Sequence, residues 1–500
     1  MNGSAVKRWT GLVLLAAALF SLTACGGQAE EEASPSPTVT PDAVPMSFTL
    51  SCTDAALHPI LSTDRTNLTL AALLWEGLFA LDPAFRPQGL LCQRYETSED
   101  GLTWTFVLRP GVTFSDGSPL TAEEVCASLN LARGAGSRFA ARLAGIRSVT
   151  AEGDRAVTVA LSAPNGNLPA LLDIPIVKGE GDTPLGTGPY VLQTGGETPC
   201  LVRRAGWWRH DSVTPPLDTI PLRPVSSADA LIQSFDTGQT SLVTVDFTGA
   251  NPLGYAGGYA RWDFPSTTML FLGFNCQKGP CRSTPVRQAI SRALDRTALA
   301  AALYAGYATA AALPVSPASP LYDASLAASL GPDTQAPAGL GEHSLTLLVN
   351  SENPYKTAAA DFLAEELGRL GLLVTVRSAG WSDYEAALKA GDFDLYLGEV
   401  MLTADFDLTN LLGRTGALNY GGHSDGETEP LLAAFRQAGD AERPAAAAAL
   451  YTHLAEAAPF APLCFKNGSV LTRWGLVSGL TPTQQDAFYG FAWSVADGTA

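Results

Sequence analysis

The chain has few of the residues on which metal sites and nucleophilic active sites are usually built. Its 500 residues include only five histidines and four methionines, and the eight cysteines form no CxxC pair. No HExxH or GxSxG pattern occurs, so the zinc helix of a metalloprotease and the nucleophile elbow of a secreted hydrolase are both absent. We therefore expect no catalytic residue, no cofactor and no dedicated metal cage.

Positive charge is also scarce. The chain carries 31 Lys and Arg against 49 Asp and Glu, which gives a formal net charge of -18. Binding to a nucleic-acid backbone requires clustered cations. The composition therefore argues against nucleic acid as a partner and fits an acidic surface that works outside the cell.

The longest apolar run lies near the start and is too short to span a membrane. Lys7 and Arg8 precede apolar residues 11–22, a pattern typical of a secretory signal. The run ends in Leu-Thr-Ala-Cys-Gly, which resembles the lipobox of bacterial lipoproteins. The resemblance implies that Cys25 gains a lipid and holds the protein on the extracellular face of the cytoplasmic membrane, the periplasmic side if the cell has an outer membrane. The alternative is an ordinary cleaved signal with an incidental cysteine.

A polar segment separates this signal from the body of the protein. Residues 26–45 are rich in Pro, Ser, Thr and Glu and contain no large apolar side chain beyond two valines. Such a segment cannot bury enough surface to offset its ordering entropy, so we expect a disordered tether. The chain as a whole is 46% hydrophobic, which suffices for large buried cores and more than one domain.

One pair of cysteines is placed to form a disulfide. Cys276 and Cys281 enclose only Gln-Lys-Gly-Pro, a turn-forming sequence after an apolar stretch. In an exported chain this spacing predicts a small disulfide loop, with a metal site as the alternative. The other body cysteines are scattered and odd in number, so at least one should be free: Cys52, Cys92, Cys126, Cys200 and Cys464.

Segments with strand and helix patterns alternate along the body. Residues 102–108 (LTWTFVL) alternate as a strand, and Thr121 opens a capping box for the helix that follows. Residues 285–304 predict helical structure that Asp295 interrupts, and residues 345–399 repeat the order of strand and helix. This alternation predicts an α/β architecture.

A series of motifs in order along the chain carries a family resemblance. Residues 98–125 read SEDGLTWTFVLRPGVTFSDGSPLTAEEV, and residues 186–190 read GTGPY. Further motifs lie at 75–78, 204–208, 274–296, 381–394 and 458–463. Together they resemble the family 5 extracellular solute-binding proteins, the dipeptide, oligopeptide and nickel receptors of ABC importers. The resemblance covers nearly all of the chain from residue 46 onward.

The resemblance implies a two-lobed, periplasmic-binding-protein-like (class II) fold with an extra N-terminal subdomain. The two lobes would close on a dipeptide or oligopeptide and deliver it to the permease subunits and ATPases of an importer. The implied boundaries are residues 46–66, 165–268 and 464–500 for lobe I, 67–164 for the subdomain and 269–463 for lobe II.

The resemblance also points to candidate ligand-binding residues. Asp405 matches the position at which peptide-binding members hold the α-amino group, and Trp381 and Tyr384 match pocket-lining positions. A carboxylate is a sound partner for an ammonium group because a charge-assisted bond offsets desolvation. The alternatives are that Asp405 or Asp407 caps the helix starting near Leu408, and that the two aromatic residues belong to the core.

Two other functions are compatible with the same sequence features. One is a receptor for a metal carried by a small chelator. The other is a surface sensor that binds peptide and signals without import.

Overall fold

The computed structural model describes residues 47–332 and 343–496, and residues 46–500 form one compact unit. Cys25 and the expected tether lie outside the described residues. Among the helices that the structure describes, none combines the length and apolar character needed to cross a bilayer.

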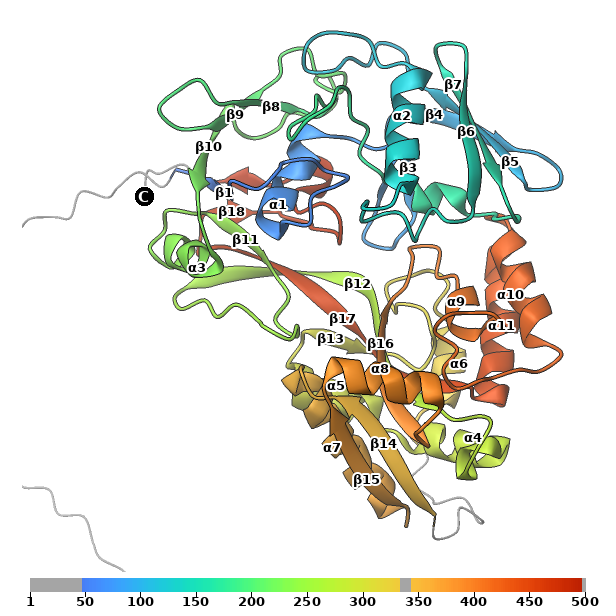
Figure 1. The fold of residues 1–500 in the computed structure, drawn as a ribbon. Helices are drawn as coiled ribbons and strands as arrows, with labels where there is room; N and C mark the ends of the chain where they lie inside the picture. Colours follow the sequence, from blue (N-terminus) through green and yellow to red (C-terminus); the bar gives the residue numbers. More distant parts are fainter. Residues whose placement is uncertain (1–46, 333–342, 497–500) are drawn as a thin grey trace, which may run out of the picture. The chain divides into compact units, whose positions relative to one another are not determined.

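A seven-stranded mixed sheet runs through the middle of the molecule (Figure 1). Its order is β11 (Leu242–Val245), β17 (Phe460–Arg473), β12 (Tyr259–Phe274), β16 (Leu395–Met401), β14 (Ser344–Asn350) and β15 (Leu373–Ala379), with β13 (Ala308–Ala310) paired to β17. The strands β11, β12, β16 and β17 pair antiparallel, whereas β14 pairs parallel with both β15 and β16.

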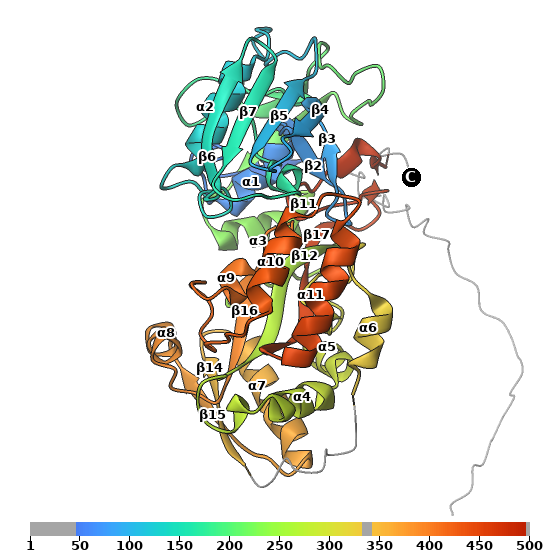
Figure 2. The ribbon, with the colours of Figure 1, turned by 90° about the vertical axis from the view of Figure 1, so that its right-hand side faces the viewer.

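Two four-stranded sheets stand on one side of the central sheet. The first has the order β1 (Leu50–Cys52), β10 (Thr219–Pro224), β9 (Cys200–Arg203) and β8 (Tyr190–Gln193). The second has the order β4 (Cys92–Thr97), β5 (Thr103–Leu108), β7 (Ala156–Leu161) and β6 (Ile146–Glu152), and α2 (Ala122–Arg133) packs on β6 and β7 (Figure 2). Two short pairs complete the strands: β2 (Phe79–Leu81) with β3 (Pro87–Gly89), and β18 (Val477–Ser478) with β19 (Ser494–Val495).

The remaining helices lie around these sheets. They are α1 (Arg65–Leu74), α3 (Ala228–Asp236), α4 (Thr284–Ala293), α5 (Arg296–Tyr304), α6 (Ala324–Ser329), α7 (Pro354–Arg369), α8 (Trp381–Ala390), α9 (Thr409–Leu412), α10 (Thr428–Gln437) and α11 (Arg443–Ala457). The alternation of strands and helices confirms the predicted α/β class.

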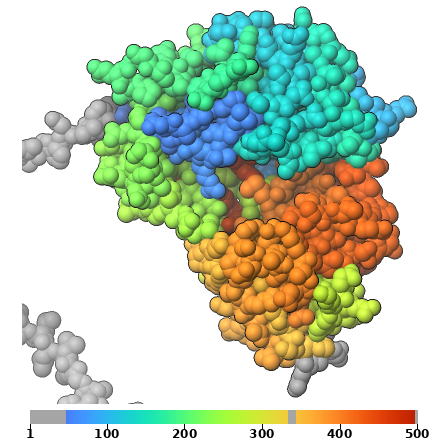
Figure 3. All heavy atoms as spheres, viewed as in Figure 1, coloured from blue at the N-terminus to red at the C-terminus, as the bar shows by residue number. Residues whose placement is uncertain are grey.

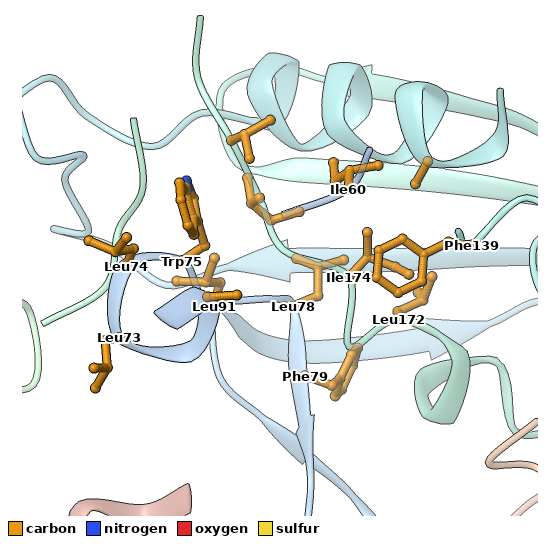
Figure 4. Close-up of a cluster of buried hydrophobic side chains, with 14 of the residues drawn as sticks. Ile60, Leu73, Leu74, Trp75, Leu78, Phe79, Leu91, Phe139, Leu172 and Ile174 are labelled. Atoms are coloured by element: carbon orange, nitrogen blue, oxygen red, sulfur yellow. The ribbon is translucent and has the colours of Figure 1, made fainter. Parts of the chain in front are cut away.

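The hydrophobic cores divide the molecule into two halves. One large core uses residues 48–264 and 470–493, and Figure 4 shows part of it around Trp75, Phe79 and Phe139. Two further cores lie on the other side and use residues 269–465 together with Phe85. The strands β12 and β17 pass from the first core into the others, so they join the two halves as one antiparallel ladder.

The predicted local elements agree with the structure in their main features. β5 covers the expected strand, and Thr121 and Glu124 form the capping box of α2. The helical stretch 285–304 is interrupted as expected: Leu294 is extended, and the Asp295 carboxylate accepts a hydrogen bond from the Ala298 N–H at 2.8 Å to cap α5.

Candidate functional site

A cleft of about 900 Å³ opens beside α1. Its walls come from α1, the segment 75–81, the loop at 208–212 and the C-terminal segment 483–491, while β16 and β17 contribute to its floor. In Figure 3 the surface is hollowed next to the blue α1 segment, and red atoms from the C-terminal part of the chain are visible inside it. A volume of this size accommodates a small-molecule or short-peptide ligand.

The floor of the cleft is a network of opposite charges. Lys466 on β17 is buried, and its Nζ lies 3.2 Å from Glu399 on β16 and 3.9 Å from Asp246. Lys466 Nζ also donates to the Thr248 carbonyl at 3.1 Å, and Lys356 on α7 reaches the same Glu399 at 3.4 Å. Because each buried charge has a partner, the floor is locally balanced and fixes β16 against β17.

One wall presents arginines around a half-buried tryptophan. The guanidinium of Arg109 lies 5.3 Å from the Trp208 ring centroid, and that of Arg209 lies 5.7 Å from the same centroid. Arg138 donates to Gln485 Oε1 at 3.4 Å and to the Pro59 carbonyl at 3.2 Å. Burial and the neighbouring Arg142 lower the pKa of Arg138 to about 10, so it remains cationic at neutral pH.

The carboxylates of this wall are already occupied by protein donors. The buried Glu76 accepts hydrogen bonds from Trp208 Nε1 at 2.8 Å, Trp207 Nε1 at 3.2 Å and Thr187 Oγ1 at 2.9 Å. Burial raises the pKa of Glu76 to about 6. Asp173 pairs with Arg142 at 2.6 Å.

Four arginines of the lining form no ion pair with any residue that the structure describes: Arg65, Arg109, Arg138 and Arg209. No carboxylate of a described residue lies within ion-pair distance of these four cations, although the charge of Arg209 partly offsets the raised pKa values of Glu76 and Asp486. The wall therefore offers guanidinium groups to an anionic ligand. Trp208 beside them offers a flat apolar surface.

Asp405 lies outside the cleft lining. It is buried in the turn after β16, where Oδ2 accepts from Asn165 Nδ2 at 3.0 Å and Oδ1 accepts from Thr403 Oγ1. The Arg443 guanidinium donates to the Asp405 backbone carbonyl. Asp407 lies next to the start of α9, whose N-cap residue is Leu408, and its Oδ1 accepts from the N–H of Thr409 at 3.0 Å.

The two predicted aromatic residues stand at the start of α8 and also lie outside the lining of the cleft. Tyr384 is buried, and its hydroxyl donates to the Leu397 carbonyl at 2.8 Å, which is the core environment given above as its alternative. Trp381 is 55% exposed, and its ring packs 5.9 Å from that of Tyr384.

The structure differs from the sequence prediction at Cys276 and Cys281, which it holds as free thiols. Cys281 is fully buried in the core beneath β12, whereas Cys276 lies half-buried with Sγ directed at the Phe274 carbonyl. Burial raises the pKa of the Cys281 thiol to about 12.

The sequence does not single out the cleft residues, because their motifs indicate the family and not the positions that contact a ligand. Arg109 follows the strand in the 98–125 motif. Trp208 is the last residue of the 204–208 motif, and Arg209 comes directly after it. Their spacing in the sequence does not show that these segments line the same cleft. The only signal of a binding surface was the pairing of arginine with tryptophan in and directly after the 204–208 motif.

A mixed α/β fold of two halves joined by crossing strands, with a ligand-sized cleft, defines a two-lobed solute-binding protein. The family model "Bacterial extracellular solute-binding proteins, family 5 Middle" matches residues 86–417. The chain therefore belongs to the family 5 extracellular solute-binding proteins, as its motifs predicted.

Curated relatives and solved structures agree with this assignment. The glutathione-binding protein GsiB of Salmonella typhi is 27% identical over 351 residues, which cover 65% of this chain and 68% of that protein. GsiB of Escherichia coli (strain K12) is 28% identical over 272 residues, covering 51% and 53%. The unliganded open form of MppA, a periplasmic murein tripeptide binding protein, has a TM-score of 0.74 at 20% identity and covers 90% of this chain and 97% of its own. HbpA2 from Haemophilus parasuis has a TM-score of 0.73 at 20% identity, covering 90% and 100%. These structures confirm the two-lobed fold.

Proposed function

We propose that this protein is the membrane-anchored receptor of an ABC importer and that it captures dipeptides or oligopeptides in the cleft beside α1. The observation that carries this proposal is the cleft wall, where arginines without carboxylate partners surround Trp208 while the neighbouring acids are engaged. A peptide brings at least one carboxylate for an arginine and side chains for the tryptophan face.

The names of similar proteins support a ligand of this class. GsiB is described as glutathione-binding and MppA as murein tripeptide binding, and both ligands are short peptides. A structure of NikZ from Campylobacter jejuni in complex with Ni(L-His) has a TM-score of 0.59 at 18% identity and covers 90% of this chain and 99% of its own. A chelated metal is therefore an alternative ligand to include in the binding assays.

We also propose that capture occurs by lobe closure. The lobes would comprise residues 46–66, 165–268 and 464–500 on one side and 269–463 on the other, with 67–164 as a peripheral subdomain. The separate cores on the two sides and the β12–β17 ladder between them support a hinge of this kind.

The binding proposal is tested with acid and amide forms of the same peptide. Isothermal titration should show tighter binding of a tripeptide acid, glutathione included, than of the C-terminally amidated peptide. Arg209→Gln should weaken binding of the acid about 10- to 150-fold, because a hydrogen bond to a charged group is worth about 1.5–3 kcal/mol. Arg369→Gln, on the outer surface of α7 and paired with Glu365, is the matched control and should bind as the unmodified protein does.

Equal affinity for the acid and the amide would contradict carboxylate recognition by this wall. Native mass spectrometry of protein purified from cells identifies the bound solute directly. Recovery of a nickel chelate instead of a peptide would replace the peptide proposal with the chelate receptor.

The anchoring part of the proposal concerns Cys25. Cys25→Ser should release the protein from membranes into the medium or the soluble extract, because the lipid is attached through this side chain. Equal retention of the variant in the detergent fraction would contradict lipid attachment at Cys25.

A further inference from the structure

Two of the five histidines converge on one carboxylate at a site remote from the cleft. His423 and Asp425 lie in the loop before α10, and His453 lies near the end of α11. His423 Nε2 and His453 Nε2 are each 3.1 Å from Asp425 Oδ2. One side-chain donor atom of each residue lies within 4.8 Å of the other two.

These separations match the spacing of ligands around a metal ion. Zinc–nitrogen and zinc–oxygen bonds of about 2.0–2.2 Å place the donors of a tetrahedral site roughly 3.3 Å apart. The Thr428 hydroxyl closes a fourth side, since its Oγ1 lies 3.0 Å from His423 Nε2 and 2.9 Å from His453 Nε2. Four polar atoms from three segments therefore surround one point.

A second carboxylate lies close to one of the histidines. Glu427 Oε2 lies 3.4 Å from His453 Nδ1, on the side of the ring that faces away from Asp425. The Glu427 side chain is 79% exposed, and a carboxylate at this place favours the tautomer with the proton on Nδ1 and the Nε2 lone pair directed at the cluster. That lone pair then faces an Asp425 oxygen, and a cation between them relieves the repulsion.

The site combines burial with one path to solvent. The side chains of His423 and His453 are only 7% and 14% exposed, whereas that of Asp425 is 31% exposed. None of the three lines the cleft, so a cation here would not compete with the transported solute. The helices α10 and α11 pack side by side (Figure 2). A cation at this site would link the loop before α10 to α11.

We propose that His423, Asp425 and His453 bind one divalent first-row transition metal ion, Zn²⁺ foremost, at a structural site outside the ligand cleft. Two imidazole nitrogens with one carboxylate oxygen form a donor set suited to zinc and poorly suited to Mg²⁺ or Ca²⁺. No sequence pattern indicates this site, because its histidines lie on different elements and match no spacing motif.

The proposal is tested by titrating EDTA-stripped, dialysed protein with Zn²⁺ in a calorimeter and with Co²⁺ in a spectrophotometer. One equivalent of Zn²⁺ should bind and raise the melting temperature. Bound Co²⁺ should show visible bands of nitrogen and oxygen ligands without a thiolate charge-transfer band. His453→Gln should abolish this binding, and Glu427→Gln, which keeps all three ligands, should weaken it about 10- to 100-fold.

His210→Gln is the matched control, because His210 is largely exposed and its only ion-pair contact with a described residue is the neighbouring Asp211. It should bind Zn²⁺ as the unmodified protein does. The site would be overturned if a His423→Gln/His453→Gln variant kept the Zn²⁺ affinity, if Co²⁺ showed thiolate ligation, or if the unmodified protein bound no Zn²⁺. Melting of the metal-free variants separates loss of metal binding from loss of the fold.

Discussion

At the scale of single residues, the buried Glu76 supports the aromatic and arginine side chains that line the cleft. Its carboxylate holds the indole N–H groups of Trp207 and Trp208, and through Trp208 it positions the ring beside Arg109 and Arg209. A buried carboxylate with three donors is therefore part of the framework that supports the arginines.

Glu76 should make stability depend on pH. Burial raises its pKa from 4.5 to about 6, so the folded protein binds this proton more tightly than the unfolded chain does. The resulting stability is fully present below about pH 4.5 and is lost as the pH rises through about 6. The loss amounts to about 2 kcal/mol. Urea denaturation of the unmodified protein and Glu76→Gln across this range should show a smaller decline in the variant.

The difference between the two proteins isolates Glu76 from other titrating groups. Glu96→Gln, at an exposed position on β4, serves as the control and should keep the full decline. A decline in Glu76→Gln as steep as that of the unmodified protein would contradict the role assigned to this carboxylate.

Sequence reasoning placed some of these residues well and others poorly. Tyr384 is buried and donates to the Leu397 carbonyl, so contact with a ligand stays a prediction. Asp405 as an amino-group ligand stays a prediction, and its partner Asn165 comes from a segment 240 residues away in the sequence. No local pattern reports such a partner, whereas the cap formed by Thr121 and Glu124 depends only on spacing and was predicted.

At the scale of elements, α2 owes its start to its capping box. Glu124 Oε2 accepts a hydrogen bond from the Thr121 N–H at 3.1 Å, and the Thr121 hydroxyl binds the same carboxylate. The Thr121 N–H at the helix start is satisfied in this way, and the Thr121 hydroxyl is held on the same carboxylate.

Thr121→Ala should therefore lower the free energy of unfolding by about 1 kcal/mol. Chemical denaturation measures this difference, and the circular dichroism of the folded state should stay unchanged. Thr357→Ala is a control in the first turn of α7, where the hydroxyl donates to the Pro354 carbonyl and caps no N–H. Equal effects of the two substitutions would contradict a specific capping contribution.

The GTGPY motif at residues 186–190 passes close to the end of α1. Gly188 N–H donates to the Leu74 carbonyl at 3.0 Å, at the end of α1. A Cβ on Gly186 would lie 2.0 Å from that carbonyl oxygen, and one on Gly188 would lie 2.6 Å from the Leu74 carbonyl carbon. The glycines are therefore needed for a close approach to α1, a reason that the sequence alone does not reveal.

At the scale of the whole molecule, the family and the two-lobed fold were predictable because the motifs lie in turns, caps and strand ends along the entire chain. The cleft was not, because its arginines come from segments that only the fold assembles: Arg65, Arg109, Arg138 and Arg209. The net charge of -18 gave no sign of them either, because it does not show how single arginines are placed.

Lobe closure should be measurable in solution. Because a ligand in the cleft would contact both lobes, small-angle X-ray scattering should show a smaller radius of gyration with saturating ligand. Arg209→Gln should reach the same compact state at a higher ligand concentration, and Arg369→Gln at the unmodified one. An unchanged radius with ligand demonstrably bound would contradict closure.

The ladder between β12 and β17 also sets the order in which the protein can fold. Its two strands pair Tyr259 with Arg473 and Gly273 with Phe460, so they lie about 200 residues apart in the chain. During synthesis β12 is made long before β17, so its backbone lacks its main hydrogen-bonding partner until β17 has been made. The apolar edge of β12 is then open to pairing with other chains, and protection by a chaperone matters most in this interval. The two halves are joined fully only when β17, close to the end of the chain, pairs with β12.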